Sequence, residues 1–204
     1  MKIKHLITVL SLSLGISATA QAQSFLQLSL TPDIQWVDSR DSISGLRLGI
    51  WSQNENVSGL DIGIANQTTG DFKGLGLGVV NLTDGDSKGL QYAFYGYNQI
   101  GGDFTGWNSG LVNNVKGSTK GLQGGLVSLT EQDFVGWQSG LYTSTKGSMK
   151  GLQTGAVNRA ANMSGVQLGL LNMTDNMESG IQIGFVNMIK NGALPIMVIA
   201  NAKF

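Results

Sequence analysis

The chain has 204 residues, with 30 glycines, 2 prolines, 1 histidine and no cysteine, and its 13 basic residues balance its 13 acidic ones. The lack of cysteine excludes disulfides, thiolate metal sites and a thiol nucleophile. The balanced charge argues against nucleic acid as a partner, because nucleic-acid-binding domains carry a basic patch or stripe.

Residues 1–22 have the three parts of a secretory signal peptide. Lys2 and Lys4 form its basic start, an apolar stretch runs over 6–16, and Ala20-Gln21-Ala22 is a small-x-small cleavage site. The apolar stretch is too short for a spanning helix, which needs about 20 apolar residues. Cleavage there removes two lysines and His5, so an exported chain of residues 23–204 keeps 11 basic and 13 acidic residues.

Residues 24–30 read SFLQLSL, an alternation that predicts a first β-strand with Leu26, Leu28 and Leu30 on one face. A polar connection over 31–42 follows it.

From about residue 45 to 190 the chain repeats one short unit. The spacings between successive units are 14, 15, 15, 17, 15, 15, 15, 14 and 15 residues. The glycine that begins each unit stands at Gly45, Gly59, Gly74, Gly89, Gly106, Gly121, Gly136, Gly151, Gly165 and Gly180.

Each unit reads as an extended strand. Over 104–115 (FTGWNSGLVNNV) residue types alternate with period two, and the glycines count against helix. Gly-Asp or Gly-Ser pairs such as Gly70-Asp71 and Gly117-Ser118 separate the units. Such pairs are typical of two-residue type II′ hairpins, and also of corners in a parallel solenoid. When the repeat has an odd number of residues and the loop an even number, equivalent side chains of neighbouring strands lie on the same face of the sheet, as an antiparallel sheet requires.

The two faces of the predicted strands differ in polarity. The glycine-rich face has a polar residue at its centre in every unit except the one with Gly76. These polar residues are Arg47, Asp61, Gln91, Asn108, Gln123, Gln138, Gln153, Gln167 and Gln182. The opposite face is apolar, with Leu60, Ile62, Ile64, Leu75, Leu77, Trp107, Leu111, Trp137, Leu141, Val166, Leu168, Leu170, Ile181, Ile183 and Phe185.

The last segment, 193–204 (ALPIMVIANAKF), alternates up to a terminal Phe204 and predicts a closing strand. It resembles the last strand of Gram-negative outer-membrane barrels, which typically ends in Phe. That resemblance implies that Phe204 is an outer-membrane assembly signal and that the barrel assembly machinery is a partner.

Units such as 165–172 (GVQLGLLN) and 180–187 (GIQIGFVN) resemble the GLQxGLVN-type units of poorly characterised bacterial surface-repeat proteins. The resemblance extends from about residue 45 to the end of the chain. It implies a location in the cell envelope.

The preferred fold is a single all-β domain over 23–204, a repetitive antiparallel meander closed as an up-and-down barrel of about 12 transmembrane strands. Polar side chains would then line the lumen and apolar ones would face lipid. The alternative is a β-solenoid with coils of about 15 residues, turned with its aliphatic residues inside and its glutamines in water. Repeated asparagines favour this alternative, because they would stack into a hydrogen-bonded ladder: Asn66, Asn81, Asn113, Asn158, Asn172 and Asn187.

The sequence contains no catalytic constellation and no metal or cofactor motif. Carboxylates such as Asp71, Asp86 and Asp103 occupy turns, where Asp belongs for backbone reasons. We therefore expect an outer-membrane structural protein or narrow passive pore, with outer-membrane lipid as a partner and no nucleic acid. The alternative function is a cell-surface binding or adhesion module that holds its partner along the glycine-rich face.

Overall fold

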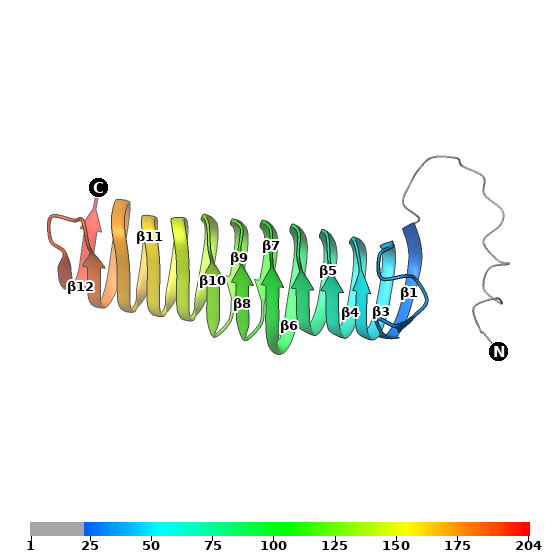
Figure 1. The fold of residues 1–204 in the computed structure, drawn as a ribbon. Coiled ribbons are helices and arrows are strands. Elements are labelled where there is room, and N and C mark those ends of the chain that lie inside the picture. Colours follow the sequence, from blue (N-terminus) through cyan, green and yellow to red (C-terminus); the bar gives the residue numbers. More distant parts are fainter. Residues whose placement is uncertain (1–22) are drawn as a thin grey trace, which may run out of the picture.

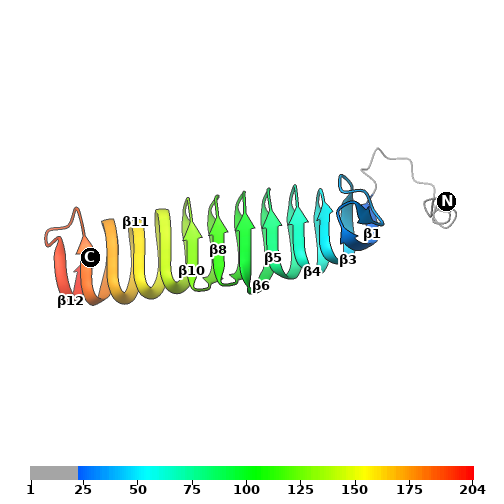
Figure 2. The ribbon, with the colours of Figure 1, turned by 60° about the horizontal axis from the view of Figure 1, so that its bottom comes forward.

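A computed structural model describes residues 23–204, so the predicted signal peptide lies outside the described residues. The chain winds into a β-solenoid whose coils stack side by side along one axis, from β1 at one end to β12 at the other (Figure 1). The same stack of coils is seen when the molecule is turned by 60° (Figure 2). The all-β class is confirmed, but the barrel was wrong and the solenoid is the observed architecture.

One sheet system contains all the strands of the described region. The longest strand, β11, continues without a break through several coils and has 56 residues. In chain order the strands are β1 Gln23–Thr31, β2 Ile34–Gln35, β3 Ser42–Asn54, β4 Val57–Thr68, β5 Phe72–Thr83, β6 Ser87–Ile100, β7 Phe104–Ser109, β8 Val112–Val115, β9 Thr119–Gly124, β10 Val127–Thr130, β11 Phe134–Ile189 and β12 Ile196–Lys203.

Each repeat forms one complete coil with two straight legs. β7 is the first leg of its coil and pairs with the first half of β6, whereas β8 is the second leg and pairs with the second half of β6. All of these pairings are parallel. Two parallel layers therefore face each other across a narrow interior. The predicted antiparallel hairpins were wrong, because the 15-residue repeat is a full turn of the chain and not half of a hairpin.

The glycines that begin the repeats stack on one another. Gly45 pairs with Gly59, Gly59 with Gly74, and the series continues at the same register along the rod. Gly121 has φ +132°, and a Cβ there would overlap the backbone carbonyl oxygen of Gly106. Only glycine has neither the steric penalty at this φ nor the Cβ. The repeated glycines thus allow the coils to approach each other at β-sheet spacing.

The Gly-Asp pairs form the corners between coils, as expected for the solenoid alternative. At these corners each aspartate accepts a hydrogen bond from the next coil. The Asp86 amide donates to Asp71 Oδ1 at 2.8 Å, and the Asp103 amide donates to Asp86 Oδ1 at 2.8 Å. The carboxylates therefore satisfy backbone donors that the turn would otherwise leave unpaired.

The interior has an apolar side and a polar side. Apolar clusters lie next to the Gly-Asp corners, for example Phe134, Met149 and Met163. The polar side holds the asparagine ladder, which is confirmed: Asn158 Nδ2 donates to Asn172 Oδ1 at 2.8 Å and also to the Leu168 carbonyl at 2.9 Å. Five asparagines donate in this way both to the next asparagine and to a carbonyl of the next coil, as in stacked cross-β structures: Asn66, Asn81, Asn98, Asn158 and Asn172. Ser128 and Thr143 interrupt the ladder between Asn113 and Asn158.

The two ends of the rod are built differently. β1 is a strand as predicted, but it pairs in parallel with β3 and buries Gln27 while Leu26 and Leu30 are exposed. The predicted closing strand is also present as β12. It pairs antiparallel with the last coil of β11, from Gly180↔Lys203 to Met188↔Ile196, and so covers that coil and does not close a barrel.

Candidate binding surface

The polar residues predicted to line a lumen fill the interior of the solenoid. All nine are between 0 and 2 % exposed. They are Arg47, Asp61, Gln91, Asn108, Gln123, Gln138, Gln153, Gln167 and Gln182. The solenoid alternative placed the glutamines in water, and this expectation was wrong. The polar-inside, apolar-outside facing that was expected for a barrel occurs here in a solenoid.

From Gln123 onward the buried glutamines form one hydrogen-bonded ladder. Gln138 Nε2 donates to Gln123 Oε1 at 2.8 Å, Gln153 Nε2 to Gln138 Oε1 at 2.8 Å, and Gln167 Nε2 to Gln153 Oε1 at 2.6 Å. Gln182 Nε2 completes the series at 2.7 Å from Gln167 Oε1. These amides bind each other, so they hold neighbouring coils together and do not present polar groups to a passing solute.

At the N-terminal end the same row contains a buried ion pair. Arg47 Nε and Nη2 donate to the two carboxylate oxygens of Asp61 at 2.8 and 2.7 Å. Arg47 Nη1 also donates to the Gln67 carbonyl at 2.8 Å. This two-point geometry is the strongest form of charge-assisted hydrogen bond. Both side chains are closed off from solvent, so this pair has a structural role.

Exposed and half-buried apolar side chains form rows on the outside of the first leg and around the adjoining corner. The first row is paired coil to coil by the strand register and consists of Leu46, Leu60, Leu75, Leu90, Trp107, Leu122 and Trp137. The corner row is the most exposed and consists of Ile50, Ile64, Val79, Leu111, Leu126, Leu141, Leu170 and Phe185. We call these two rows the apolar face. Its middle part is less aliphatic, since Ser109, Gly124, Ser139 and Thr154 lie between the two rows.

Charged residues are arranged in order along the same leg. A row of exposed lysines lies two residues before the first apolar row. Each lysine lies two residues after a corner, which carries Asp before Lys73 and Lys88 and Ser before Lys120 and Lys150. The register stacks Lys73 on Lys88, and Lys120 stands at the equivalent place. The lysine row is Lys73, Lys88, Lys120 and Lys150. The outside of the first leg is therefore charged at the aspartate corners and the lysine row, and apolar at the opposite corner.

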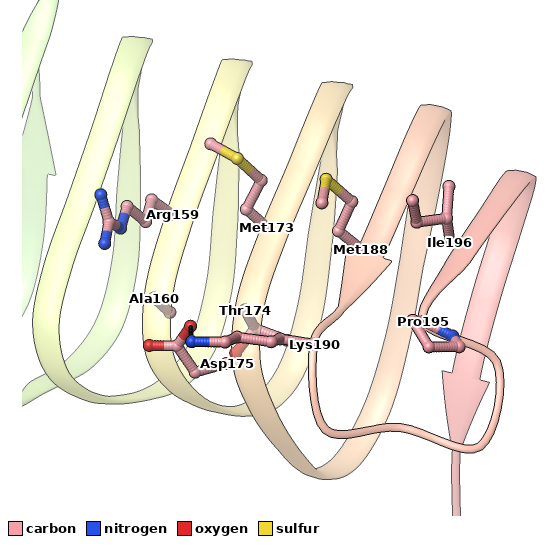
Figure 3. A pocket seen from close by; sticks show the side chains of 9 residues that line it. All are labelled: Arg159, Ala160, Met173, Thr174, Asp175, Met188, Lys190, Pro195 and Ile196. Atoms are coloured by element: carbon pink, nitrogen blue, oxygen red, sulfur yellow. Dashed lines mark ion pairs between the residues drawn. The ribbon is translucent and has the colours of Figure 1, made fainter.

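A shallow pocket lies on the second leg near the C-terminal end, in the coils next to β12 (Figure 3). Met173 and Met188 line it on neighbouring coils, and Pro195 and Ile196 close one side. Its volume is about 380 Å³. Asp175 and Lys190 form an ion pair at its edge, with 3.9 Å between Lys190 Nζ and Asp175 Oδ1.

Sequence reasoning missed this pocket. The available signal was the residue that follows each repeated asparagine, which is Met after Asn172 and Asn187. The pocket also needs the loop before β12, which no repeat encodes.

Phe204 follows β12 and is completely exposed. Its assignment as an assembly signal stays a prediction.

Within 23–204 no group of three or more His, Cys, Asp or Glu side chains lies close enough to hold a metal ion. The same part of the chain contains no helix of the length and hydropathy that a membrane-spanning helix requires. A search of protein-family models, of curated proteins and of solved structures found no match to this chain.

Proposed function

We propose that the protein is a non-catalytic binding module of the cell envelope that lies along a lipid surface through its apolar face. The observation that carries this proposal is the corner row, in which apolar side chains of successive coils stay exposed along most of the rod. Ile64 is 56 % exposed, Leu141 60 % and Leu170 64 %. Soluble monomers rarely expose continuous apolar surface on this scale unless it binds something.

The charge order beside the apolar face favours lipid over a protein partner. At a membrane interface, aliphatic groups enter the acyl region, Trp rings lie at headgroup level, and lysine stems extend toward anionic headgroups. The leg presents these types in this order, with the corner row, then Trp107 and Trp137, then Lys73 and its equivalents. The aspartates are farthest from the apolar corner, where they avoid anionic lipid.

A peripheral position suits this fold better than a spanning one. Most of the interior amides bind each other or backbone carbonyls, for example Gln153 Nε2 with the Arg159 carbonyl at 3.0 Å. The packed polar side chains therefore hold the coils together and do not line a path for a solute. Export by the predicted signal peptide would place the rod on an envelope membrane, and the outer membrane remains the proposed location.

Vesicle flotation tests the proposal. The full chain is expressed in a Gram-negative host, and the product is purified as the host processes it. Vesicles of phosphatidylglycerol with phosphatidylcholine should carry the protein to the top of a gradient, and pure phosphatidylcholine vesicles should carry less. Protein that stays at the bottom with both compositions would exclude a lipid partner.

Matched charge variants locate the binding surface. Ile64→Glu/Leu170→Glu should lower binding to both vesicle types by about a hundredfold or more, because each buried aliphatic side chain contributes about 1.5–3 kcal/mol. Thr69→Glu/Gln132→Glu adds the same charge at exposed sites next to the aspartate corners and should leave binding close to that of the parent. Equal losses in the two variants would mean that net charge, and not the apolar face, controls binding.

Removing lysines tests the electrostatic part separately. Lys73→Gln/Lys88→Gln should weaken binding to the anionic vesicles by about thirtyfold, at about 1 kcal/mol for each basic residue near the surface. Binding to phosphatidylcholine should not change. A loss that is the same for both compositions would contradict the proposed role of the lysine row.

A further inference from the structure

The shallow pocket on the second leg (Figure 3) adjoins a second, polar pocket formed by the coils that precede it. Arg159 and Asp175 line both pockets, so the two form one groove along the axis of the rod. We call it the second-leg groove. Its polar half includes Tyr142, Ser144 and Lys146, and its apolar half includes Met173, Met188 and Ile196. Volumes of about 380 and 270 Å³ are enough for one small molecule that occupies both halves.

The outward residues of the second leg change character within this groove. One such residue follows each polar residue of the interior ladder, and Arg159 is the only charged one among the ten. It stands between Ser144 and the two methionines. In chain order the row is Gln53, Gln67, Leu82, Gln99, Asn114, Leu129, Ser144, Arg159, Met173 and Met188.

Arg159 is also the unpaired cation of the groove. Lys190 Nζ lies 3.9 Å from Asp175 Oδ1, and Lys146 Nζ lies 3.1 Å from Glu131 Oε1. Arg159 forms no ion pair within residues 23–204. Among the described residues, Asp175 is the only carboxylate that lines the groove, and Lys190 is its partner. The groove therefore has a net positive charge that is available to an anion.

The position of the Arg159 side chain matches the division of the groove. Its guanidinium points away from Met173 and Met188 (Figure 3), and it lines the polar half together with Ser144 and Lys146. It also lines the apolar half, where its methylene stem can cover apolar surface. A guanidinium with free N–H groups binds a carboxylate by two parallel hydrogen bonds.

We infer that the second-leg groove binds a carboxylate with an unbranched apolar chain, such as a medium-chain fatty acid. The carboxylate accepts hydrogen bonds from Arg159, and the chain lies across Met173 and Met188 to Ile196. These four residues lie on successive strands, so the path spans three strand spacings, or about 14 Å. Methionine side chains are flexible and adapt to an apolar chain.

Isothermal titration calorimetry with decanoate below its micelle concentration tests the inference on the purified protein in lipid-free buffer. One decanoate should bind per chain. Octanoate should bind about tenfold more weakly, and hexanoate weaker again by a similar factor, because each step removes two methylenes from the apolar half. Decyltrimethylammonium has the same chain with a positive head group, and it should bind at least tenfold more weakly than decanoate.

Two charge-removing variants locate the head group. Arg159 is exposed, so Arg159→Gln should fold as the parent does and should raise the dissociation constant for decanoate by about tenfold or more. It should not weaken binding of decyltrimethylammonium. Lys116→Gln is the matched control, since it removes an exposed cation from the same leg outside the groove, and it should bind decanoate as the parent does.

A third variant locates the apolar chain. Met188→Gln keeps the length of the side chain but makes the apolar half polar, so the affinity difference between decanoate and hexanoate should shrink. The inference goes beyond the proposed function, because the groove lies on the other leg from the lysine row. Ile64→Glu, on the apolar face, should leave decanoate binding unchanged, and Arg159→Gln should leave vesicle binding unchanged.

Four results would overturn the inference. They are no binding of decanoate, equal binding of the positively charged analogue, equal effects of Arg159→Gln and Lys116→Gln, and decanoate binding that Ile64→Glu abolishes. The last result would assign the fatty acid to the apolar face. Vesicle flotation without decanoate is a separate measurement, so failure of the groove and failure of the lipid proposal are distinguishable.

Discussion

The N-terminal and C-terminal coils share one backbone but join their coils through different interior side chains. In β3 and β4 the central row holds the Arg47–Asp61 ion pair, whereas in β11 it holds the glutamine ladder. Gly76 follows Asp61 in this row, and Phe72 occupies the space beside it. The row is therefore divided into a charged part, a gap and an amide part.

The difference shows what a repeated polar position requires. A glutamine both donates and accepts, so it can be satisfied by identical neighbours on both sides. An ion pair is satisfied only by its own partner, and a single substitution leaves a buried charge. Gln91 and Asn108 show the intermediate case: Gln91 Oε1 and both amide atoms of Asn108 lack a hydrogen-bond partner within the described structure.

Breaking the ion pair should have the largest effect. Asp61→Leu leaves the guanidinium of Arg47 buried without a counter-charge, and such changes cost about 3–5 kcal/mol. Because repeat arrays open locally, the loss should appear first as faster hydrogen exchange in β3 and β4, with β11 unchanged. Hydrogen exchange with mass spectrometry measures both regions in one experiment.

The control for this variant replaces the ion pair by two glutamines, like those that form the ladder in β11. Arg47→Gln/Asp61→Gln removes both charges and supplies two groups that bind each other, so exchange in β3 and β4 should stay close to that of the parent. If the double variant exchanged as fast as Asp61→Leu, the cost would come from the altered packing and not from the unpaired charge.

Interrupting the glutamine ladder should have a smaller effect. Gln167→Leu keeps the approximate size of the side chain but removes the donor to Gln153 Oε1. An unsatisfied buried acceptor costs about 1–3 kcal/mol, measured as a lower urea midpoint. Gln91→Leu should cost less, because Gln91 Oε1 already lacks a partner. Equal losses at the two positions would mean that the ladder contributes no more than packing.

Much of this arrangement could be predicted from the sequence. The repeat length, the extended strands, the asparagine ladder and the polar-inside facing follow from residue type and spacing. The sequence did not show whether each repeat forms one strand or a coil with two legs. In a sheet of hairpins, a repeat of odd length with a two-residue turn also keeps equivalent side chains on the same face. The hydrophobic pattern alone is equally consistent with both folds.

A parity change within each repeat was the overlooked signal. Asn108 and Asn113 are both buried, yet they are five residues apart, an odd distance. A straight strand places residues at odd separations on opposite faces, so it cannot bury both. The chain must bend between them, and it does so near Gly110, between β7 and β8. The C-terminal pocket had no comparable signal, because the loop before β12 is outside the repeat.

Completing the row of glutamines at Asn108 should have the smallest effect on the free energy of unfolding, and this change should be stabilising. Asn108 lies between Gln91 and Gln123 in register but is one methylene shorter, so its amide reaches neither neighbour. Asn108→Gln should join Gln91 to the ladder and raise the free energy of unfolding by about 1 kcal/mol, the usual net value of a buried hydrogen bond.

Asn108→Leu distinguishes this repair from the simple removal of an unsatisfied amide. If both substitutions raised the urea midpoint equally, the gain would come from removing a buried polar group. If only Asn108→Gln raised it, the new hydrogen bonds would be responsible, and the amide row would act as one unit from Gln91 to Gln182. A lower midpoint for Asn108→Gln would mean that the interior at β7 is too narrow for the longer side chain, so the gap would be set by coil geometry.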